Sequence, residues 1–161
     1  MTLRRPLTLI NGLLRLLPTG DRLPGADIGA RVHRTTAQAI ANATGSAIIF
    51  NSTRYDTSAL WSGSNPTRLT CSVAGRYLIG GSIEFAVGSA GIRQISIRLN
   101  GTTPIAPQNS SHPANRLVVA TVYSLAVGDY AELLVYHENG SSLDILSSSA
   151  FSPEFYMQLL P

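Results

Sequence analysis

Apolar and polar residues alternate over short stretches along most of the chain, which is typical of β-strands separated by turns. The alternation is clearest in 92–99, 117–125 and 130–136. Turn residues end or join these stretches, namely Asn100-Gly101 and Val127-Gly128-Asp129. Because Asn, Gly and Asp tolerate the backbone angles that tight turns demand, the pattern predicts antiparallel strands joined by short turns.

Weaker alternation predicts further strands, so the total is about ten short strands with hardly any helix. These strands are expected at 30–35, 47–50, 69–73, 77–87, 143–146 and 151–160. Gly80-Gly81 interrupts one of them and indicates a bulge or a close backbone approach. Asn139-Gly140 predicts a hairpin between 130–136 and 143–146. Segment 38–43 fits a short helix or a strand. Segment 51–56 is expected to be a polar bend, and segments 58–66 and 102–114 are expected to be polar loops.

The first residues form a separate pattern, LTLI and LLRLL around Asn11-Gly12. Asn-Gly between two apolar runs is a strong hairpin signal, and a lone hairpin that is apolar on both faces must pack against something. Segment 18–29 is rich in Pro and Gly, so we divide the chain into an arm with its linker (1–25) and a body (26–161). The anchoring residues of the arm are expected to be Leu7, Leu9, Asn11, Gly12, Leu13 and Leu16.

Composition favours an assembled body. Only 13% of the 161 residues are charged, which suits a surface that is partly hidden between subunits. The net charge of +3 is small and its arginines are scattered, so we expect no nucleic-acid partner. No apolar run approaches the ~20 residues of a membrane-spanning helix, and Asn11, Gly12 and Arg15 interrupt the run that would resemble a secretion signal.

Candidate chemistry is sparse. The three histidines, His33, His112 and His137, lie on separate segments, and no Gly-x-Ser-x-Gly motif is present, so no catalytic residue is assigned. Asp129 suits hydrogen bonding within its turn better than calcium binding. We therefore expect no enzyme activity, no metal and no cofactor. Cys71, the only cysteine, is expected to be a small buried apolar residue.

Over Ala30–Pro161 the order of certain residues resembles the globular head of complement subcomponent q and its tumour-necrosis-factor-like relatives. The residues that carry this resemblance are Phe50-Asn51, Tyr55-Asp56, Leu69-Thr70-Cys71, Val73, Gly75, Tyr77, Leu125, Gly128-Asp129-Tyr130, Glu132-Leu133, Phe151-Ser152, Phe155, Leu159 and Leu160. The resemblance implies an antiparallel jelly-roll sandwich that assembles as a homotrimer. It places six residues in the core or at the threefold interface: Tyr77, Tyr123, Tyr130, Phe151, Phe155 and Leu159.

The first 25 residues or so are similar to the start of many bacteriophage structural proteins, which implies a location in the virion. We therefore predict a trimeric decoration, spike or short fibre unit of a phage head or tail, bound to other virion proteins through its arm. The alternative is a module of a tail fibre that binds a host receptor or a carbohydrate. Its ligand loops would present Trp61, Asn65, His112 and Asn115, unless Trp61 folds back over the sandwich edge.

Overall fold

The structure, a computed structural model, describes residues 7–10, 13–16, 27–88, 91–111, 115–148 and 153–161. Regular structure in these residues is entirely β-strand. The strands are β1 (Leu7–Ile10), β2 (Leu13–Leu16), β3 (Gly29–His33), β4 (Gln38–Ile40), β5 (Ser46–Ala47), β6 (Ser52–Asp56), β7 (Arg68–Thr70), β8 (Gly75–Glu84), β9 (Ile92–Leu99), β10 (Thr103–Pro104), β11 (Gln108–Ser111), β12 (Arg116–Leu125), β13 (Tyr130–His137), β14 (Leu143–Ile145) and β15 (Glu154–Leu159).

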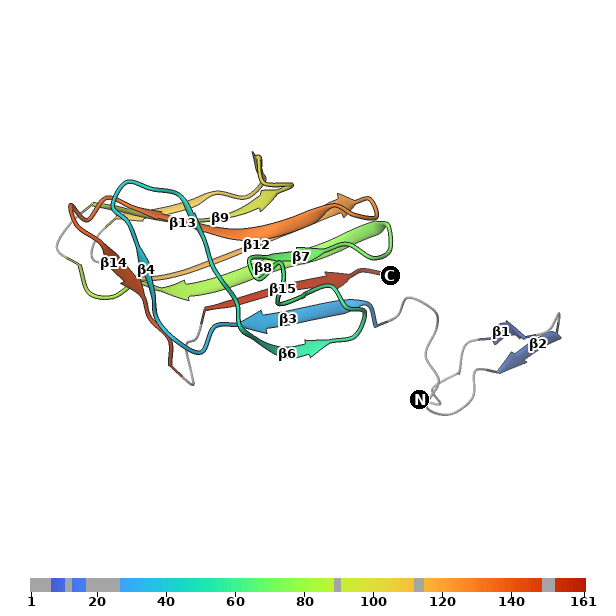
Figure 1. Ribbon diagram of the computed structural model, residues 1–161. Coiled ribbons are helices and arrows are strands. Elements are labelled where there is room, and N and C mark those ends of the chain that lie inside the picture. The colour runs from blue at the N-terminus through green and yellow to red at the C-terminus, as the bar shows by residue number, and fades with distance from the viewer. Residues whose placement is uncertain (1–6, 11–12, 17–26, 89–90, 112–114, 149–152) are drawn as a thin grey trace, which may run out of the picture.

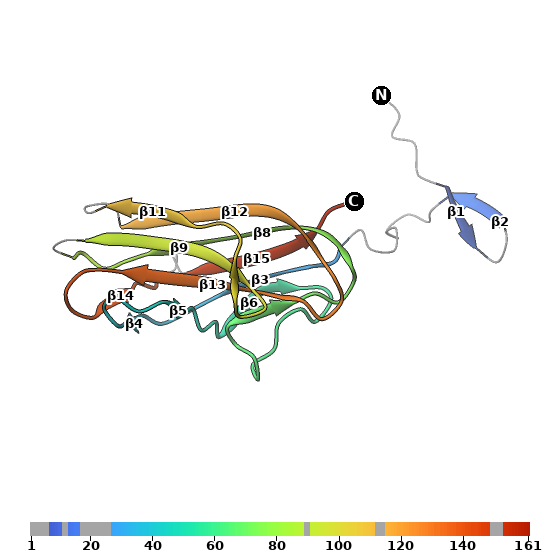
Figure 2. The same cartoon turned by 90° about the horizontal axis from the view of Figure 1, so that it is seen from above.

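Two antiparallel sheets pack face to face to form the body (Figures 1 and 2). The five-stranded sheet has the order β12-β8-β15-β3-β6. In the second sheet β9 pairs with β13, β10 and β11 pair with β9, and β5 and β7 pair with β13. A separate pair, β14 and β4, lies at one end of the sandwich. The sequence prediction of an all-β antiparallel sandwich is confirmed.

The core fills the space between the two sheets because alternate residues of each strand face inward. On β8, for example, Tyr77 and Ile79 are fully buried whereas Leu78 between them is partly exposed. Phe155 of β15 stacks on Phe50 with 5.9 Å between the ring centroids. Cys71 is 2% exposed within this core, as its place in an apolar strand predicts.

Gly80 and Gly81 lie in the middle of β8, which is continuous through them and is not interrupted as the sequence suggested. At these two glycines, neighbouring side chains pack close to the backbone of β8 on both faces of the sheet. A Cβ at Gly81 would lie 2.8 Å from a methyl carbon of Leu133 in the opposite sheet. A Cβ at Gly80 would lie 2.6 Å from Cζ of Tyr156, whose ring covers this position on the outer face. The absence of side chains here is what allows both contacts.

Two predicted turns are confirmed by their backbone angles. Asn100 and Gly101 have φ values of 49° and 72°, the left-handed conformation expected of an Asn-Gly turn. Gly128 has a φ of 91°, and the Asp129 carboxylate accepts a hydrogen bond from the amide of Ala126 at 2.8 Å. Asp129 therefore stabilises its own turn, as its sequence position indicates.

Segment 38–43, for which the sequence left a helix or a strand open, contains the strand β4. Three local predictions need correction. Segment 51–56 is not a bend, because Ser52–Asp56 forms the edge strand β6. Loop 102–114 contains the strands β10 and β11, which pair with β9. The expected hairpin after β13 is also wrong, because β14 pairs with β4 instead.

This last correction has a visible cause. The chain after β13 is held by segment 42–43, since the amide of Ala43 donates to the carbonyl of His137 at 2.8 Å. The amide of Gly140 donates to the side chain of Asn42 at 2.7 Å. These bonds direct the chain from Asn139-Gly140 toward β4 and away from its preceding strand.

At the N-terminus, β1 and β2 pair with Ile10 opposite Leu13. Residues 11 and 12, which the sequence places in the turn, lie outside the described residues. The division of the chain into an arm (1–25) and a body (26–161) stays a prediction.

The contact at Gly81 can be tested by the variant Gly81→Ala. We expect it to lower the free energy of unfolding by about 1–3 kcal/mol, because the added methyl group overpacks the space between the sheets. Gly63→Ala is the matched control, since a Cβ at Gly63 has no neighbour within 4 Å. Urea unfolding followed by circular dichroism measures both. Equal stability of the two variants would contradict this account of the core.

Candidate functional site: the open face of the five-stranded sheet

The outer face of the five-stranded sheet is not covered by any other described segment, and we call it the open face. The cross-strand pairing brings together residues from distant parts of the chain. Two rows of neighbours are Ala120, Gly80, Tyr156, Arg31 and Tyr55, and Val118, Ser82, Glu154, His33 and Ser52. A third row contains Val122, Leu78, Gln158 and Gly29.

The β12 side of the open face is apolar. Val118 is 60% exposed and Val122 is 52% exposed, and Leu78 beside Val122 is partly exposed. Exposed valines in alternate positions of a long strand are typical of a face that packs against another surface. This half of the open face is therefore suited to protein contact.

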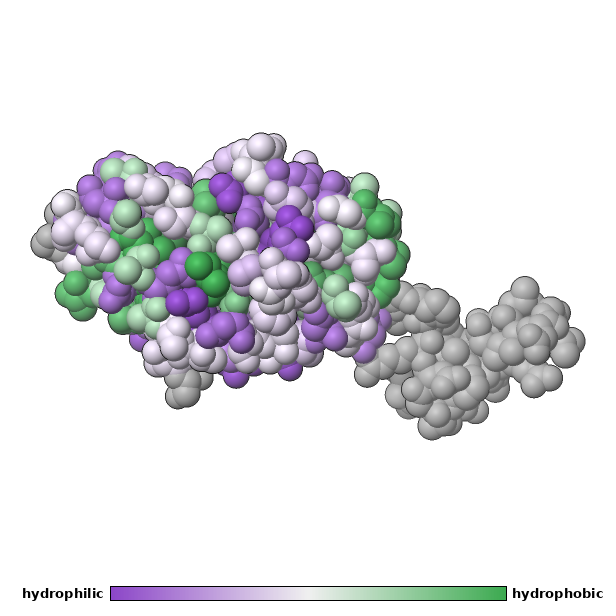
Figure 3. Space-filling view, viewed as in Figure 1, coloured by the Kyte–Doolittle hydropathy of each residue, from purple (hydrophilic) through white to green (hydrophobic). Residues whose placement is uncertain are grey.

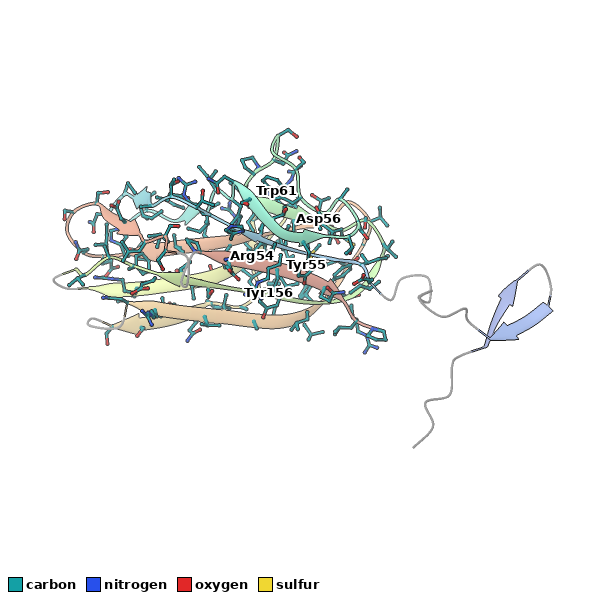
Figure 4. All side chains as sticks on the ribbon, turned by 90° about the horizontal axis from the view of Figure 1, so that it is seen from below. Arg54, Tyr55, Asp56, Trp61 and Tyr156 are labelled. Carbon is teal, nitrogen blue, oxygen red and sulfur yellow. The ribbon has the colours of Figure 1, made fainter. Side chains whose placement is uncertain are left out.

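The β6 side of the open face combines aromatic rings with an ion-pair cluster. Tyr55 and Tyr156 lie on either side of Arg31 in one row, and Figure 4 shows Arg54 beside them. Glu154 joins the arginines, because Arg31 Nε donates to one of its carboxylate oxygens at 2.5 Å. Arg54 Nη2 donates to the other oxygen at 2.9 Å.

The ion-pair cluster shifts the pKa values of Glu154 and His33. Burial raises the pKa of Glu154, but the hydrogen bonds and charges of Arg31 and Arg54 outweigh this effect and the pKa is lowered. Burial and the charge of Arg54 lower the pKa of His33, and the charge of Glu154 opposes them only in part. Glu154 is thus held ionised and His33 neutral. The carboxylate of Glu154 is thus paired with arginines of the same chain. This pairing lowers the free-energy cost of burying these charges against another surface.

The aromatic residues selected from the sequence divide into several groups. Tyr77 and Phe155 are fully buried core residues, and burial followed by the neighbouring Cys71 raises the pKa of Tyr77 to about 12. Tyr130 is partly buried under Arg68, whose guanidinium carbon lies 4.4 Å from the ring centre. Tyr123 is 40% exposed.

Leu159 is partly buried, and Phe151 lies outside the described residues. The register places Tyr55 and Tyr156 on the open face, and neither is among the six residues that the resemblance assigned to the core or the interface. The alternation of β15 identifies Tyr156, because it faces away from its buried neighbours Phe155 and Met157.

The described residues of the predicted ligand loops lie in different environments. The Asp56 carboxylate accepts hydrogen bonds from the amides of Leu60 and Trp61, each at 3.0 Å. The indole of Trp61 packs against the core, and its Nε1 donates to the carbonyl of Pro66 at 3.4 Å. Trp61 therefore folds back on the body at the base of the projecting loop (Figure 4). Asn65 is exposed near the tip of that loop.

Of the other two loop residues, Asn115 is partly buried and its carbonyl accepts a hydrogen bond from the amide of Phe85 at 2.8 Å. His112 lies outside the described residues.

Among the anchoring residues, Leu7 and Leu9 belong to β1, and Leu13 and Leu16 belong to β2.

No catalytic arrangement emerges from the described residues. His137 is fully buried, and its two ring nitrogens contact the carbonyl of Ile40 at 3.0 Å and the amide of Asn139 at 3.2 Å. Within the described ranges, no group of three or more His, Cys, Asp or Glu could hold a metal ion. No helix in that part of the chain is long and apolar enough to cross a membrane.

Comparison with known proteins identifies the fold. No protein-family model matches the chain, and no curated protein matches its sequence. Three similar solved structures are the globular domain of zebrafish complement 1qA, Eiger TNF from S. frugiperda and murine APRIL. Their TM-scores are 0.53, 0.56 and 0.59, at 15%, 12% and 12% identity.

The match covers 83%, 84% and 83% of this chain and 98%, 94% and 99% of the three structures, respectively. The chain therefore has the jelly-roll fold of the complement 1q and tumour-necrosis-factor proteins, as the resemblance implied. Identities this low show the fold alone.

The pKa shift of His33 predicts a pH dependence of stability. Because its pKa is below 6.5 in the folded chain, the unfolded chain binds a proton at higher pH. The stability contributed by neutral His33 is present above pH 6.5 and is lost as pH falls toward the folded pKa. We expect urea midpoints of the native chain to fall between pH 7 and pH 5, and those of His33→Gln to fall less. Parallel pH profiles of the two proteins would rule out this role of His33.

Proposed function

We propose that the protein is a non-enzymatic subunit of a homotrimer and that its open face packs against neighbouring copies. The observation that carries the proposal is the concentration of exposed valines and tyrosines on a sheet face where Glu154 already pairs with Arg31 and Arg54. The fold of the similar structures is typically non-catalytic and homotrimeric, which supports the same assembly.

The two halves of the open face complement each other physically. The β12 half offers branched apolar side chains, Val118 and Val122, and the β6 half offers the rings of Tyr55 and Tyr156. Burying apolar side chains contributes roughly 25 cal/mol for each Å² removed from water, and aromatic residues are enriched where proteins meet. A face that differs on its two sides can make head-to-tail contacts, and these close into a trimeric ring when each copy is rotated by one third of a full turn relative to the next.

We further propose that the trimer is a structural component of a bacteriophage virion, as a decoration, spike or short fibre unit. Support comes from the first 25 residues or so, with their resemblance to phage structural proteins and their apolar hairpin sequence. In this proposal the arm attaches the trimer to other virion proteins. A receptor- or carbohydrate-binding module is the less favoured alternative, because Trp61 is held against the body.

The trimer is tested by placing charge on the open face. We expect Val118→Asp and Val122→Asp to convert the assembly to single chains, because a carboxylate buried between copies would have no partner. Val87→Asp is the control, since Val87 is 87% exposed and lies outside the open face. Sedimentation equilibrium measures the mass of each variant, and circular dichroism verifies folding. Trimers of all three variants would disprove the role of the open face.

Attachment to the virion is tested in the full chain with the paired variant Leu9→Asp/Leu14→Asp. We expect it to lose association with particles purified from the source organism by roughly tenfold or more, because two charges replace an apolar contact. Thr8→Asp is the control within the same hairpin. Mass spectrometry of gradient-purified particles measures the amount bound. If even the native chain is missing from the particles, the virion assignment fails.

A further inference from the structure

Two tight turns lie side by side at one end of the body, the turn between β7 and β8 and the turn between β12 and β13. The amide of Cys71 donates to the carbonyl of Asp129 at 2.7 Å. The amide of Gly128 donates to the carbonyl of Cys71 at 2.9 Å. These backbone hydrogen bonds join the two turns into a single surface.

Each turn is also held in place by a side chain. The hydroxyl of the buried Tyr77 donates to the carbonyl of Val73 at 2.7 Å. In the other turn, the Asp129 carboxylate accepts a hydrogen bond from the amide of Ala126 at 2.8 Å and one from the side chain of Asn100 at 2.9 Å. A surface that is ordered before its partner binds loses little conformational entropy on binding.

This surface is apolar, although turns are usually polar. Val127 is 67% exposed and Val73 is 43% exposed, and Ala74 and Ala126 beside them are exposed as well. We call these four residues the apolar end. Figure 3 shows hydrophobic residues at the end of the body that carries the C-terminus and the start of β3 in Figure 1. Adjacent exposed apolar side chains on an ordered surface indicate a contact site.

The charges of the two turns indicate the chemistry of the partner. Asp129 is the only charged residue in segments 71–75 and 126–129, and its carboxylate already accepts the two hydrogen bonds described above. A charged partner surface placed against Val73 and Val127 would lose its hydration without gaining an opposite charge. The partner that fits the apolar end is therefore an apolar protein surface.

The chain enters the body beside the apolar end. The amide of Leu160 donates at 2.8 Å to the carbonyl of Arg76, which directly follows the first of the two turns. The amide of Leu159 donates to the carbonyl of Ile28 at 2.9 Å. Because Ile28 directly precedes β3, the first described residues of the body lie at this end.

Chain length keeps the partner of the arm close to the apolar end. Residues 17–26 separate β2 from the first described residue of the body. A segment of this length spans at most roughly 33–36 Å. A protein that binds the arm is therefore present at a high effective concentration near the apolar end, which favours a second contact there.

From these observations we propose that the apolar end docks on an apolar surface of the virion protein that binds the arm. The contact buries Val73 and Val127, so the attachment has two parts, one supplied by the arm and one by the body. The inference rests on the proposed attachment function and deepens it, because it assigns attachment residues on the body. It also orients the body, with the end that carries the C-terminus toward the particle.

Photo-crosslinking in the full chain on purified particles tests the contact. The photoreactive amino acid benzoylphenylalanine replaces Val127 in one variant, Thr8 in a second and Val87 in a third. We expect the probe at position 127 to link to the same virion protein as the probe at position 8. The probe at position 87 is the control and should lose this link, because Val87 is 87% exposed but follows the ten-residue strand β8 at its other end.

The linked protein, identified by mass spectrometry, decides the result. The inference is overturned if the probe at position 127 links to nothing, to a different virion protein or to a second copy of this chain. If the probe at position 8 still links to the particle in that case, the proposed attachment stands and only the docking of the apolar end fails. If the native chain is missing from the particles, both fail.

A charge substitution in the full chain provides a second measurement. Val127→Asp should lower the amount bound to particles by roughly tenfold or more, because a carboxylate would be buried without a partner. The matched control Val87→Asp and the conservative variant Val127→Ile should both bind as the native chain does. Sedimentation equilibrium and circular dichroism verify that each variant keeps the native mass and fold. Undiminished binding of Val127→Asp would contradict the contact.

Discussion

The close packing around Gly80 and Gly81 determines both faces of the five-stranded sheet. On the inner face, the missing side chain of Gly81 lets Leu133 of the opposite sheet approach β8. On the outer face, the missing side chain of Gly80 lets the ring of Tyr156 lie across the sheet. Since interiors are packed at nearly crystalline density, one added methyl group at either position must displace a neighbour. The sandwich core and the open face thus depend on the same two residues.

The open face follows from this arrangement. Tyr156 lies low over β8, which leaves a continuous surface from the valines of β12 to Tyr55 of β6. Glu154 binds Arg31 and Arg54, so the positive charge of the two arginines is partly neutralised within the single chain. Burying an apolar surface with internally paired charges costs less free energy than burying the same surface with unpaired charges. This is the physical basis for the proposed assembly.

Local sequence signals predicted the elements whose structure is locally determined. The alternation in 92–99 and 130–136 and the Asn100-Gly101 turn were sufficient to place β9, β13 and the turn after β9. The edge strand β6 was missed because Ser52–Asp56 is polar on an exposed edge and carries no alternation. The pairing of β14 with β4 was missed because it joins segments about 100 residues apart, and local turn chemistry carries no information about such a partner.

Local sequence patterns likewise could not predict which residues meet on the open face. Tyr55 and Tyr156 were visible as aromatic residues, but only the register of β6, β3 and β15 places them in one row. The Arg31, Arg54 and Glu154 cluster likewise joins three distant strands. The jelly-roll fold could be inferred earlier because an ordered series of residues resembled known relatives. The residues of the open face required the pairing of the strands.

Oxidative footprinting of Tyr55 and Tyr156 across a dilution series tests the central claim most directly. Tyr55 is 40% exposed and Tyr156 is partly exposed in the single chain, so burial between copies would change their labelling. The account predicts slow labelling at high concentration, where the mass is three times that of the 17.1 kDa chain, and faster labelling as the assembly dissociates. Labelling rates that stay constant while the mass falls from three chains to one would contradict the claim that the open face joins the copies.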